Sequence, residues 1–358
     1  MYKGFDTSAL AYMYELKAKY YDNSIEENAI SILKKYGANL IRLRIFNNPY
    51  TLDGKDYGAG ICDINYLKKN VEYCKENKID YLLDFHYSDC WADPGKQILP
   101  KAWVNLSVNE LEEEIYKFTL DILNALDYKP IMVQIGNEIT NGMLWPLGKT
   151  DNFDNLVRFV NAGIRAVNDF DRNIKTMIHL DNGTNNILYH YWFDNYFKLG
   201  GLDFDYIGVS YYQIWNKHLN VLKESVIDII NTYHKEVIIA ETSFPFSLDD
   251  YKENINENER KGMALKQELV SNLQYDVSIK GQCDYFVDLG KLINEIEGLN
   301  GFIYWGAELI PSDGSSWATY EGIEYMHEKG PLGNEWANQA VFDYNGNVLP
   351  VLDTIKKL

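Results

Sequence analysis

The sequence contains eight short apolar runs, and these alternate with helix-like stretches along the chain. This alternation restricts the fold more than any other feature of the sequence. Short apolar runs bounded by polar residues are typical of buried strands, and longer segments with apolar residues every three or four positions are typical of helices. Segments of the second kind lie at 25–37, 64–78 and 108–126. The runs are YKGFD (2–6), LIRLRI (40–45), YLLDFH (81–86), IMVQIG (131–136), KTMIHL (175–180), YIGVSY (206–211), VIIAE (237–241) and GFIYWG (301–306).

Eight strand-then-helix units predict a (β/α)8 TIM barrel formed by a single domain over residues 1–358. A length of 358 residues would also allow two domains, but one α/β barrel can absorb it. A doubly wound sheet is the alternative. It usually has fewer strands and a glycine-rich phosphate turn, and no GxGxxG segment is present.

Nearly every predicted strand ends in a polar or aromatic residue. In a barrel of this type the C-terminal ends of the strands form the active face, so these residues are the candidates for a functional site. They are Asp6, Arg44, His86, Asn137, Glu138, His179, Tyr211, Glu241 and Trp305. Asp89, Trp91 and Asp181, which follow strand ends, complete the predicted substrate-binding set.

Two glutamates stand where an apolar run stops. Asn-Glu occurs six times in the chain, but only the copy at 137 directly follows a strand-like run, and Glu241 follows VIIA in the same way. Two carboxyl groups at strand ends suggest glycoside hydrolysis, in which one stays protonated to donate to the leaving oxygen and the other attacks the anomeric carbon. We therefore predict Glu138 and Glu241 as the catalytic pair.

Strand parity sends two arginines into the predicted barrel. Successive side chains of a strand alternate, so the aliphatic residues at 41, 43 and 45 share the face that meets the helices, and Arg42 and Arg44 share the other. Buried charges need partners, and Asp84 and His86 on the next strand have matching parity. A structural ion network in the barrel is compatible with catalysis.

The neighbours of the two glutamates have predicted roles and plainer alternatives. Arg44 and Tyr211 are expected to keep the nucleophile ionised, and Asn137 to bind the sugar 2-hydroxyl. His86 and His179 would orient hydroxyls or carboxylates, or would be ordinary buried histidines. Trp305 would stack on a sugar, or would simply fill the core.

Composition narrows the classes of partner. A net charge of −18 and a pI near 4.8 disfavour nucleic acid and polyanions and leave neutral substrates open. No apolar run reaches the length of a membrane span. Aromatic residues make up 14% of the chain, which suits a carbohydrate groove and equally a well-filled core. Six scattered histidines without HxH or HExxH spacing argue against a metal-dependent hydrolase.

Cysteine spacing and the N-terminus give further expectations. The four cysteines, at 62, 74, 90 and 283, have no metal-finger spacing; Cys62 and Cys74 would be either bridged or free thiols. The first ten residues lack the basic start and apolar region of a signal peptide. We expect either a cytoplasmic protein or a secreted one whose signal has been removed.

Three segments carry a family resemblance: DFHYSDCWADPGKQ (84–97), VQIGNEITNGMLWPLG (133–148) and the Glu-Thr-Ser-Phe-Pro turn at 241–245. They resemble glycoside hydrolase family 53, the endo-β-1,4-galactanases that act on arabinogalactan, and segments at 19–24, 39–49 and 334–352 are similar as well. The resemblance implies a (β/α)8 barrel with a retaining mechanism. It also implies Glu138 as acid/base and Glu241 as nucleophile, in agreement with the interpretation from the residues.

The chain departs from the family pattern in three places. After SYY it has Gln213-Ile214-Trp215-Asn216-Lys217 in place of proline, an aromatic residue and histidine. After YW it has Gly306-Ala307-Glu308 in place of Glu-Pro, and Phe244 replaces a tyrosine. We expect these residues to lie in loops that shape the sugar subsites, so they leave the substrate's length and linkage open.

These observations predict a monomeric, retaining endo-β-1,4-galactanase without organic cofactor, its two carboxyl groups about 5–5.5 Å apart. Some family members hold a structural calcium, and Asp249-Asp250 is an acidic cluster without EF-hand spacing. One alternative is a mannanase, xylanase or cellulase-like hydrolase, or an exo-acting enzyme that trims short galacto-oligosaccharides. The other is a catalytically silent sugar-binding barrel.

Overall fold

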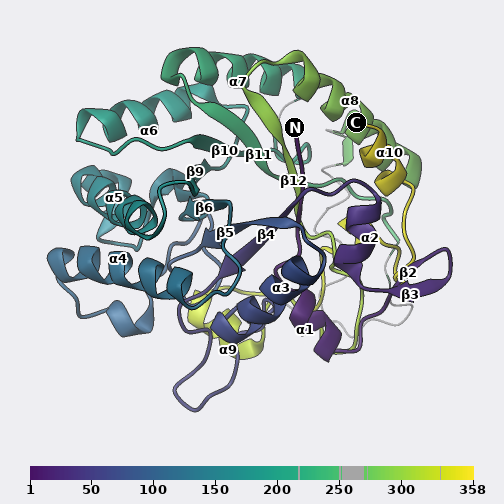
Figure 1. Ribbon diagram of the computed structural model, residues 1–358, viewed down its shortest axis with the longest axis horizontal. Helices are drawn as coiled ribbons and strands as arrows, with labels where there is room; N and C mark the ends of the chain where they lie inside the picture. The colour runs from purple at the N-terminus through teal and green to yellow at the C-terminus, as the bar shows by residue number, and fades with distance from the viewer. Residues whose placement is uncertain (217, 250, 252–269, 272, 331) are drawn as a thin grey trace.

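The computed structural model describes residues 1–216, 218–249, 251, 270–271, 273–330 and 332–358. Eight parallel strands close into a barrel in the order β1-β12-β11-β10-β9-β6-β5-β4, with helices around it (Figure 1). This confirms the (β/α)8 fold, and each of the eight predicted runs is a strand. The barrel strands are β1 Tyr2–Asp6, β4 Leu40–Ile45, β5 Asp80–Phe85, β6 Met132–Ile135, β9 Lys175–Leu180, β10 Tyr206–Ser210, β11 Glu236–Thr242 and β12 Leu299–Tyr304.

Helices cover the outside of the barrel, and two short hairpins extend from it. The hairpins are β2 Tyr20–Asp22 with β3 Ile25–Glu27, and β7 Gly142–Met143 with β8 Gly148–Lys149. The helices are α1 Leu10–Glu15, α2 Ala29–Lys35, α3 Ile64–Glu76, α4 Val108–Asn124, α5 Phe153–Phe170, α6 Asn186–Lys198, α7 Leu219–Tyr233, α8 Ile279–Glu295, α9 Tyr320–Met326 and α10 Val351–Lys357. No helix in these ranges is long and apolar enough to cross a membrane.

Side chains at the helix starts explain where the predicted helices begin. Asp63 caps α3, and Ser107 forms a reciprocal capping box with Glu110 at the start of α4. The stretch at 25–37, predicted as one helix, is split. It starts with β3, and the side chain of Asn28 then accepts hydrogen bonds from the first backbone N–H groups of α2.

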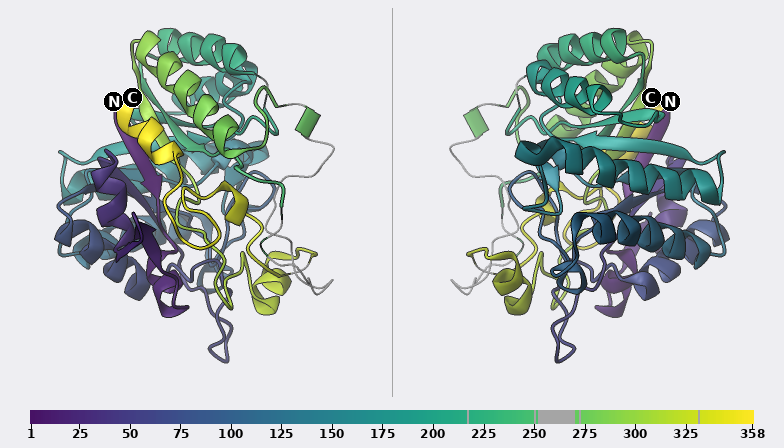
Figure 2. Two further views of the ribbon diagram at one scale, coloured as in Figure 1. Left: turned by 90° about the vertical axis from the view of Figure 1, so that its right-hand side faces the viewer. Right: turned by 90° about the vertical axis from the view of Figure 1, so that its left-hand side faces the viewer.

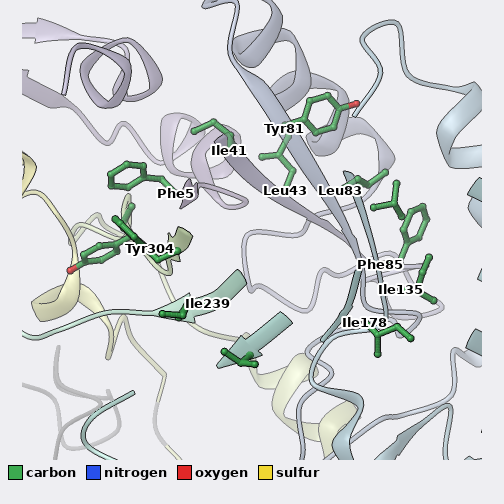
Figure 3. Close-up of a cluster of buried hydrophobic side chains, with 14 of the residues drawn as sticks. Phe5, Ile41, Leu43, Tyr81, Leu83, Phe85, Ile135, Ile178, Ile239 and Tyr304 are labelled. Atoms are coloured by element: carbon green, nitrogen blue, oxygen red, sulfur yellow. The ribbon is translucent and has the colours of Figure 1, made fainter. Parts of the chain in front are cut away.

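Outward-facing strand residues form the main core, between the barrel and its helices. Figure 3 shows side chains of this layer, including Ile41, Leu43 and Phe85. Inside the barrel the chain alternates as strand parity predicts. A lower layer of Leu40, Leu82, Met132 and Met177 is apolar. Two residues further along the same four strands lie Arg42, Asp84, Gln134 and His179, all buried, so a polar layer rests on an apolar one.

The two termini lie side by side at the end of the barrel where the strands begin (Figure 2). The helix α9 lies away from them in the same views. The opposite end of the barrel, where the strands end, is therefore free of the termini.

The turn after β6 is held in place by a buried tryptophan. Trp192 of α6 is fully buried, and its indole N–H donates to the backbone carbonyl of Ile139 at 3.0 Å. This turn is conformationally unusual, because Glu138 has φ 46° and ψ 50°, a left-handed conformation that is unfavourable for residues other than glycine. The indole thus stabilises a turn with little intrinsic preference for its shape.

Replacing Trp192 by phenylalanine should therefore destabilise the protein. The Trp192→Phe variant leaves the Ile139 carbonyl buried without its donor, and we expect the free energy of unfolding to fall by about 1–3 kcal/mol. Denaturant unfolding would measure the change. Tyr191→Phe is the matched control, since that neighbouring ring is 54% exposed, and it should change stability by less than about 0.5 kcal/mol. Equal effects of the two variants would contradict the assignment.

Candidate active site

A cleft of about 520 Å³ opens at the C-terminal ends of the barrel strands. Most of the predicted site residues line it, although they come from strands far apart in the sequence. The predicted residues on its wall are Asp6, Arg44, His86, Trp91, Asn137, Glu138, Asp181, Glu241 and Trp305.

The guanidinium of Arg42 lies at the base of the cleft and holds four acceptors. Its Nη1 donates to Glu241 at 2.8 Å and to Asp6 at 3.2 Å. Its Nη2 donates to Asp84 at 2.9 Å and to the Asn137 side-chain carbonyl at 2.7 Å. Arg42 is only 1% exposed, so these charges stabilise one another in a region where none would be stable alone.

Glu241 points into the cleft because β11 contains an irregularity in its pairing with β10. Val209 pairs with Ile239, but the next residue, Ser210, pairs with Glu241, so one residue of β11 is inserted. Such a β-bulge re-aims the side chains that follow it. Without the bulge, Glu241 would share the outward face of Ile239.

Two donors hold the carboxyl group of Glu241. Arg42 binds Oε1, and the hydroxyl of Tyr212 donates to Oε2 at 2.9 Å. Burial raises the pKa of Glu241, and Arg42 and Tyr212 both act against this rise by stabilising the carboxylate.

Glu138 has a different environment. Its Oε1 accepts one hydrogen bond, from the Ser210 hydroxyl at 2.6 Å, and no arginine or lysine pairs with it within the described residues. Burial and the nearby Glu241 raise its pKa well above the usual range for glutamate. Of the two coupled carboxyl groups, Glu138 therefore keeps a proton under conditions where Glu241 is ionised.

Indole rings form one wall of the cleft. Trp305 lies with its ring centroid 4.7 Å from that of Trp336 and 6.1 Å from that of Trp91. Trp215 continues the row, 5.8 Å from Trp336, and is 54% exposed. Flat apolar faces beside polar groups are suited to stacking against a sugar.

Three further predicted residues lie on the cleft wall with their polar groups partly engaged. His86 accepts a hydrogen bond from Ala92 N–H through Nδ1, and its Nε2 lies 3.1 Å from Asp84. Asn137 donates to the Ala92 carbonyl. Asp181 accepts from Thr140, and burial raises its pKa.

The structure corrects two assignments beside the nucleophile. Arg44 was expected next to Glu241, but its guanidinium donates to the Ala59 carbonyl and lies over the Trp91 ring, 4.1 Å from the centroid. Tyr211 is fully buried on the outer side of β10, where its ring stacks on Tyr285 of α8. Glu241 is instead in contact with Arg42 and Tyr212. Arg42 is two positions before Arg44 in the sequence, and Tyr212 is one position after Tyr211.

Two other predicted sugar contacts are also corrected, because their side chains are fully buried and lie off the cleft wall. Asp89 accepts from the backbone N–H groups of Asn48 and Lys101 and pairs with the Lys101 ammonium, which fixes the loop after β5. His179 lies beneath the cleft, with Nε2 2.9 Å from the Ser210 hydroxyl.

Sequence reasoning missed several residues of the site. Arg42 was predicted to point inward but was not placed in the site, although its parity was the available signal. On β10 the same alternation of side chains places Ser210 on the inner face, so this residue could also have been predicted. Trp336 lies in the segment 334–352 that resembles the family, but it follows no strand run, so reasoning from strand ends did not select it.

The departures from the family pattern occupy different environments. Trp215 lies on the cleft wall, as expected. Phe244 was expected in a sugar-binding loop, but it is buried against Tyr285 with a centroid distance of 5.2 Å. Lys217 lies outside the described residues.

The cysteines and the acidic cluster give no metal centre in the part of the chain that the structure describes. All four cysteines are free thiols there, which decides the Cys62–Cys74 alternative. No group of three or more His, Cys, Asp or Glu residues is placed to hold a metal ion within the described ranges. Asp250 lies outside them, so the calcium expectation stays a prediction.

A (β/α)8 barrel with two coupled carboxyl groups in an aromatic-lined cleft has the features of a glycoside hydrolase. The chain matches the model of Glycosyl hydrolase family 53 over residues 2–355, and it belongs to that family.

Similar proteins span almost the whole chain. The GH53 catalytic domain of Ignisphaera aggregans superimposes with a TM-score of 0.88 at 38% identity, covering 98% of this chain and 94% of that one. An uncharacterized protein of Niallia circulans is 34% identical, covering 99% of this chain and 93% of its own length. An endo-beta-1,4-galactanase of Bacillus subtilis (strain 168) is 31% identical, covering 99% of this chain and 85% of its own length.

Glu308, another departure from the family pattern, is buried next to the site. Its Oε1 accepts a hydrogen bond from Ala9 N–H at 2.9 Å, and its Oε2 has no hydrogen-bond partner among the described residues. Burial, followed by the nearby Asp6, raises the pKa of Glu308 to about 8, with Arg44 acting in the opposite direction.

The raised pKa of Glu308 predicts a stability that falls with pH. The folded protein binds this proton more tightly than the unfolded chain, so the contribution of Glu308 to stability is fully present below about pH 4.5 and is lost as pH rises through 8. We expect Glu308→Gln to raise the free energy of unfolding by about 1–3 kcal/mol at pH 8 and to have little effect near pH 4. Denaturant unfolding at both values would measure this. Glu297→Gln, at an exposed position, is the control, and a gain independent of pH would contradict the prediction.

Proposed function

We propose that this chain is a retaining endo-β-1,4-galactanase, with Glu138 as general acid/base and Glu241 as nucleophile. The observation that carries the proposal is the unequal environment of two coupled carboxyl groups in one cleft. Glu241 has a guanidinium and a phenol that favour the carboxylate, and Glu138 has neither. Membership of glycosyl hydrolase family 53 and the galactanase relative support the same reaction.

In the first step a carboxylate oxygen of Glu241 attacks the anomeric carbon, and the bond from that carbon to the leaving sugar's oxygen breaks. Glu138 gives its proton to that oxygen, so the leaving sugar departs as a neutral alcohol. Arg42 and Tyr212 hold the attacking group in place. The products of this step are a glycosyl ester on Glu241 and an ionised Glu138.

In the second step the Glu138 carboxylate removes a proton from water as the water oxygen attacks the anomeric carbon. The ester bond breaks, Glu241 leaves as a carboxylate, and Glu138 is protonated again. Because the carbon is attacked twice, from opposite faces, the product keeps the β configuration.

The cleft wall supports a polymeric, neutral substrate. The row of indoles from Trp91 through Trp305 and Trp336 to Trp215 is longer than a single ring contact and suits several consecutive sugars. The chain's charge of −18 disfavours polyanions. Endo action on a chain is therefore favoured over removal of a single end residue.

Release of reducing ends from debranched β-1,4-galactan, beside mannan, xylan and carboxymethyl-cellulose, tests the activity. We expect mixed short galacto-oligosaccharides from galactan alone. Glu138→Gln should lower kcat/KM by about 10²–10⁴-fold, and Glu241→Gln by at least as much. Glu295→Gln, an exposed residue paired with Lys223, is the control and should match the wild type.

Other outcomes of this assay would select another function. Turnover of a galactotetraose without release from polymer would indicate an oligosaccharide-trimming enzyme. Preference for mannan, xylan or cellulose would reassign the substrate, and activity on none of them would leave a carbohydrate-binding barrel.

The stereochemistry of the product tests the mechanism separately. Proton NMR of a fresh digest of galactotetraose should show the β anomer first, with the α anomer appearing only by mutarotation. The same mechanism predicts carboxyl groups about 5–5.5 Å apart. Initial formation of the α anomer would show inversion and would contradict the assignment of Glu241 as nucleophile.

A further inference from the structure

A chain of hydrogen bonds runs from the acid Glu138 down into the barrel. Ser210 Oγ lies 2.6 Å from Glu138 Oε1, and His179 Nε2 lies 2.9 Å from Ser210 Oγ. On the other side of the ring, His179 Nδ1 lies 3.2 Å from Gln134 Nε2. The three residues beneath Glu138 come from β6, β9 and β10, neighbouring strands of the barrel, and all three are buried.

The direction of this chain decides which oxygen of Glu138 carries the acid proton. A serine hydroxyl has one hydrogen, so Ser210 donates either to His179 or to Glu138. If it donates to His179, Oε1 must hold the carboxyl proton, and that proton points into the barrel and away from the leaving sugar. If it donates to Glu138, the proton is on the other oxygen, which remains for the cleft.

The Gln134 amide allows two arrangements of the His179 ring. Its Nε2 has two hydrogens and lies near four acceptors, which are Asp84 Oδ1 at 2.6 Å, the Gly136 carbonyl at 3.0 Å, Asn137 Oδ1 at 3.1 Å and His179 Nδ1 at 3.2 Å. Asp84 is paired with a buried arginine and takes one hydrogen. The second hydrogen goes either to His179 Nδ1, which is then unprotonated, or to Gly136 or Asn137.

Asn137 takes part in the second arrangement. Its Oδ1 accepts from Arg42 at 2.7 Å and lies 3.1 Å from His179 Nδ1, so it accepts a ring proton there if the second Gln134 hydrogen goes to Gly136. The role of Glu138 selects the first arrangement, because a general acid needs its proton on the oxygen that faces the leaving sugar.

His179 has one ring proton to place, because it is neutral. Burial and the nearby Arg42 lower its pKa well below the usual range; Asp84 acts the other way and His86 in the same direction as Arg42. A proton on the cleft-facing oxygen of Glu138 requires Oε1 to accept from Ser210, so the single ring proton lies on Nε2 and is donated to Ser210, and Nδ1 accepts from Gln134.

Resting on the proposed function, we propose that His179 and Ser210 are positioning residues that fix the acid proton of Glu138 on its cleft-facing oxygen. His179 donates through Nε2–H to Ser210, and Ser210 donates to Glu138 Oε1. The same bonds serve both steps of catalysis: they hold the protonated acid in orientation and stabilise the carboxylate that remains after the proton has left.

The tautomer of His179 is the direct test and needs no substrate. In the full-length enzyme labelled with ¹⁵N-histidine, the His179 signals are identified by their loss in His179→Gln. We expect a neutral ring with the proton on Nε2, unchanged between about pH 5 and 8. A proton on Nδ1, or a ring that becomes charged within that range, would overturn the proposal.

Kinetics of Ser210→Ala, Ser210→Thr and Ser225→Ala separate positioning from general structural damage. Galactotetraose needs acid assistance, whereas a 2,4-dinitrophenyl β-galactobioside has a leaving group that departs without a proton. Ser210→Ala should lower kcat/KM for galactotetraose about tenfold or more and change the value for the aryl glycoside little. Ser210→Thr keeps the hydroxyl and should recover most activity, and Ser225→Ala, a buried serine of α7, should match the wild type.

The pH profile gives an independent readout. Burial and the carboxyls of Glu241, Asp181 and Asp93 raise the pKa of Glu138, and the Ser210 hydrogen bond acts in the opposite direction. Ser210→Ala should shift the basic limb of kcat/KM for galactotetraose upward by about 0.5–1 pH unit.

Equal losses on both substrates without a shift of the basic limb would overturn the proposal. If the wild type turned over neither substrate, the proposed galactanase function would fail, and the histidine spectrum would still decide the direction of the hydrogen bonds.

Discussion

A single buried arginine determines the electrostatics of the strand-end cleft. Arg42 binds Asp6 from β1, Asp84 from β5 and Glu241 from β11, and it also holds Asn137 in the turn after β6. A guanidinium is costly to bury without acceptors, and carboxyl groups are costly to bury without donors, so the two kinds of group stabilise one another here. The network therefore fixes the relative positions of four separate parts of the barrel mouth.

This network makes two glutamates chemically different. Glu241 is part of it and is favoured as a carboxylate. Glu138 lies outside it, and burial first and then the repulsion of Glu241 raise its pKa. The difference depends on the bulge in β11, which turns Glu241 towards Arg42. A regular strand would direct this side chain to the helix layer, and the pair would not exist.

The barrel could be predicted well from the sequence because each strand is an apolar run. Along each run the side chains alternate between the barrel interior and the helix layer, and both environments restrict which residues fit. The same parity placed Arg42 inside. Regular alternation along β10 also puts Tyr212 on the inner face with Ser210 and Tyr211 on the outer one, so the choice of Tyr211 misapplied the rule. The rule itself failed where the backbone departs from regular geometry, at the bulge in β11 that re-aims Glu241. Loop residues such as Trp336 were beyond pattern reasoning, because their position is set by tertiary packing alone.

The site also contains two features that are unfavourable by themselves. Glu138 adopts a left-handed backbone conformation, and Glu308 is buried with one carboxyl oxygen unpaired. Each is unfavourable by itself, and each persists because well-packed structure surrounds it: the indole of Trp192 fixes the turn beyond Glu138, and apolar strand faces pack the layer beneath. The stability of the core thus compensates for a strained and charged cleft. A substitution that relaxes this strain should therefore lower activity while the protein still folds.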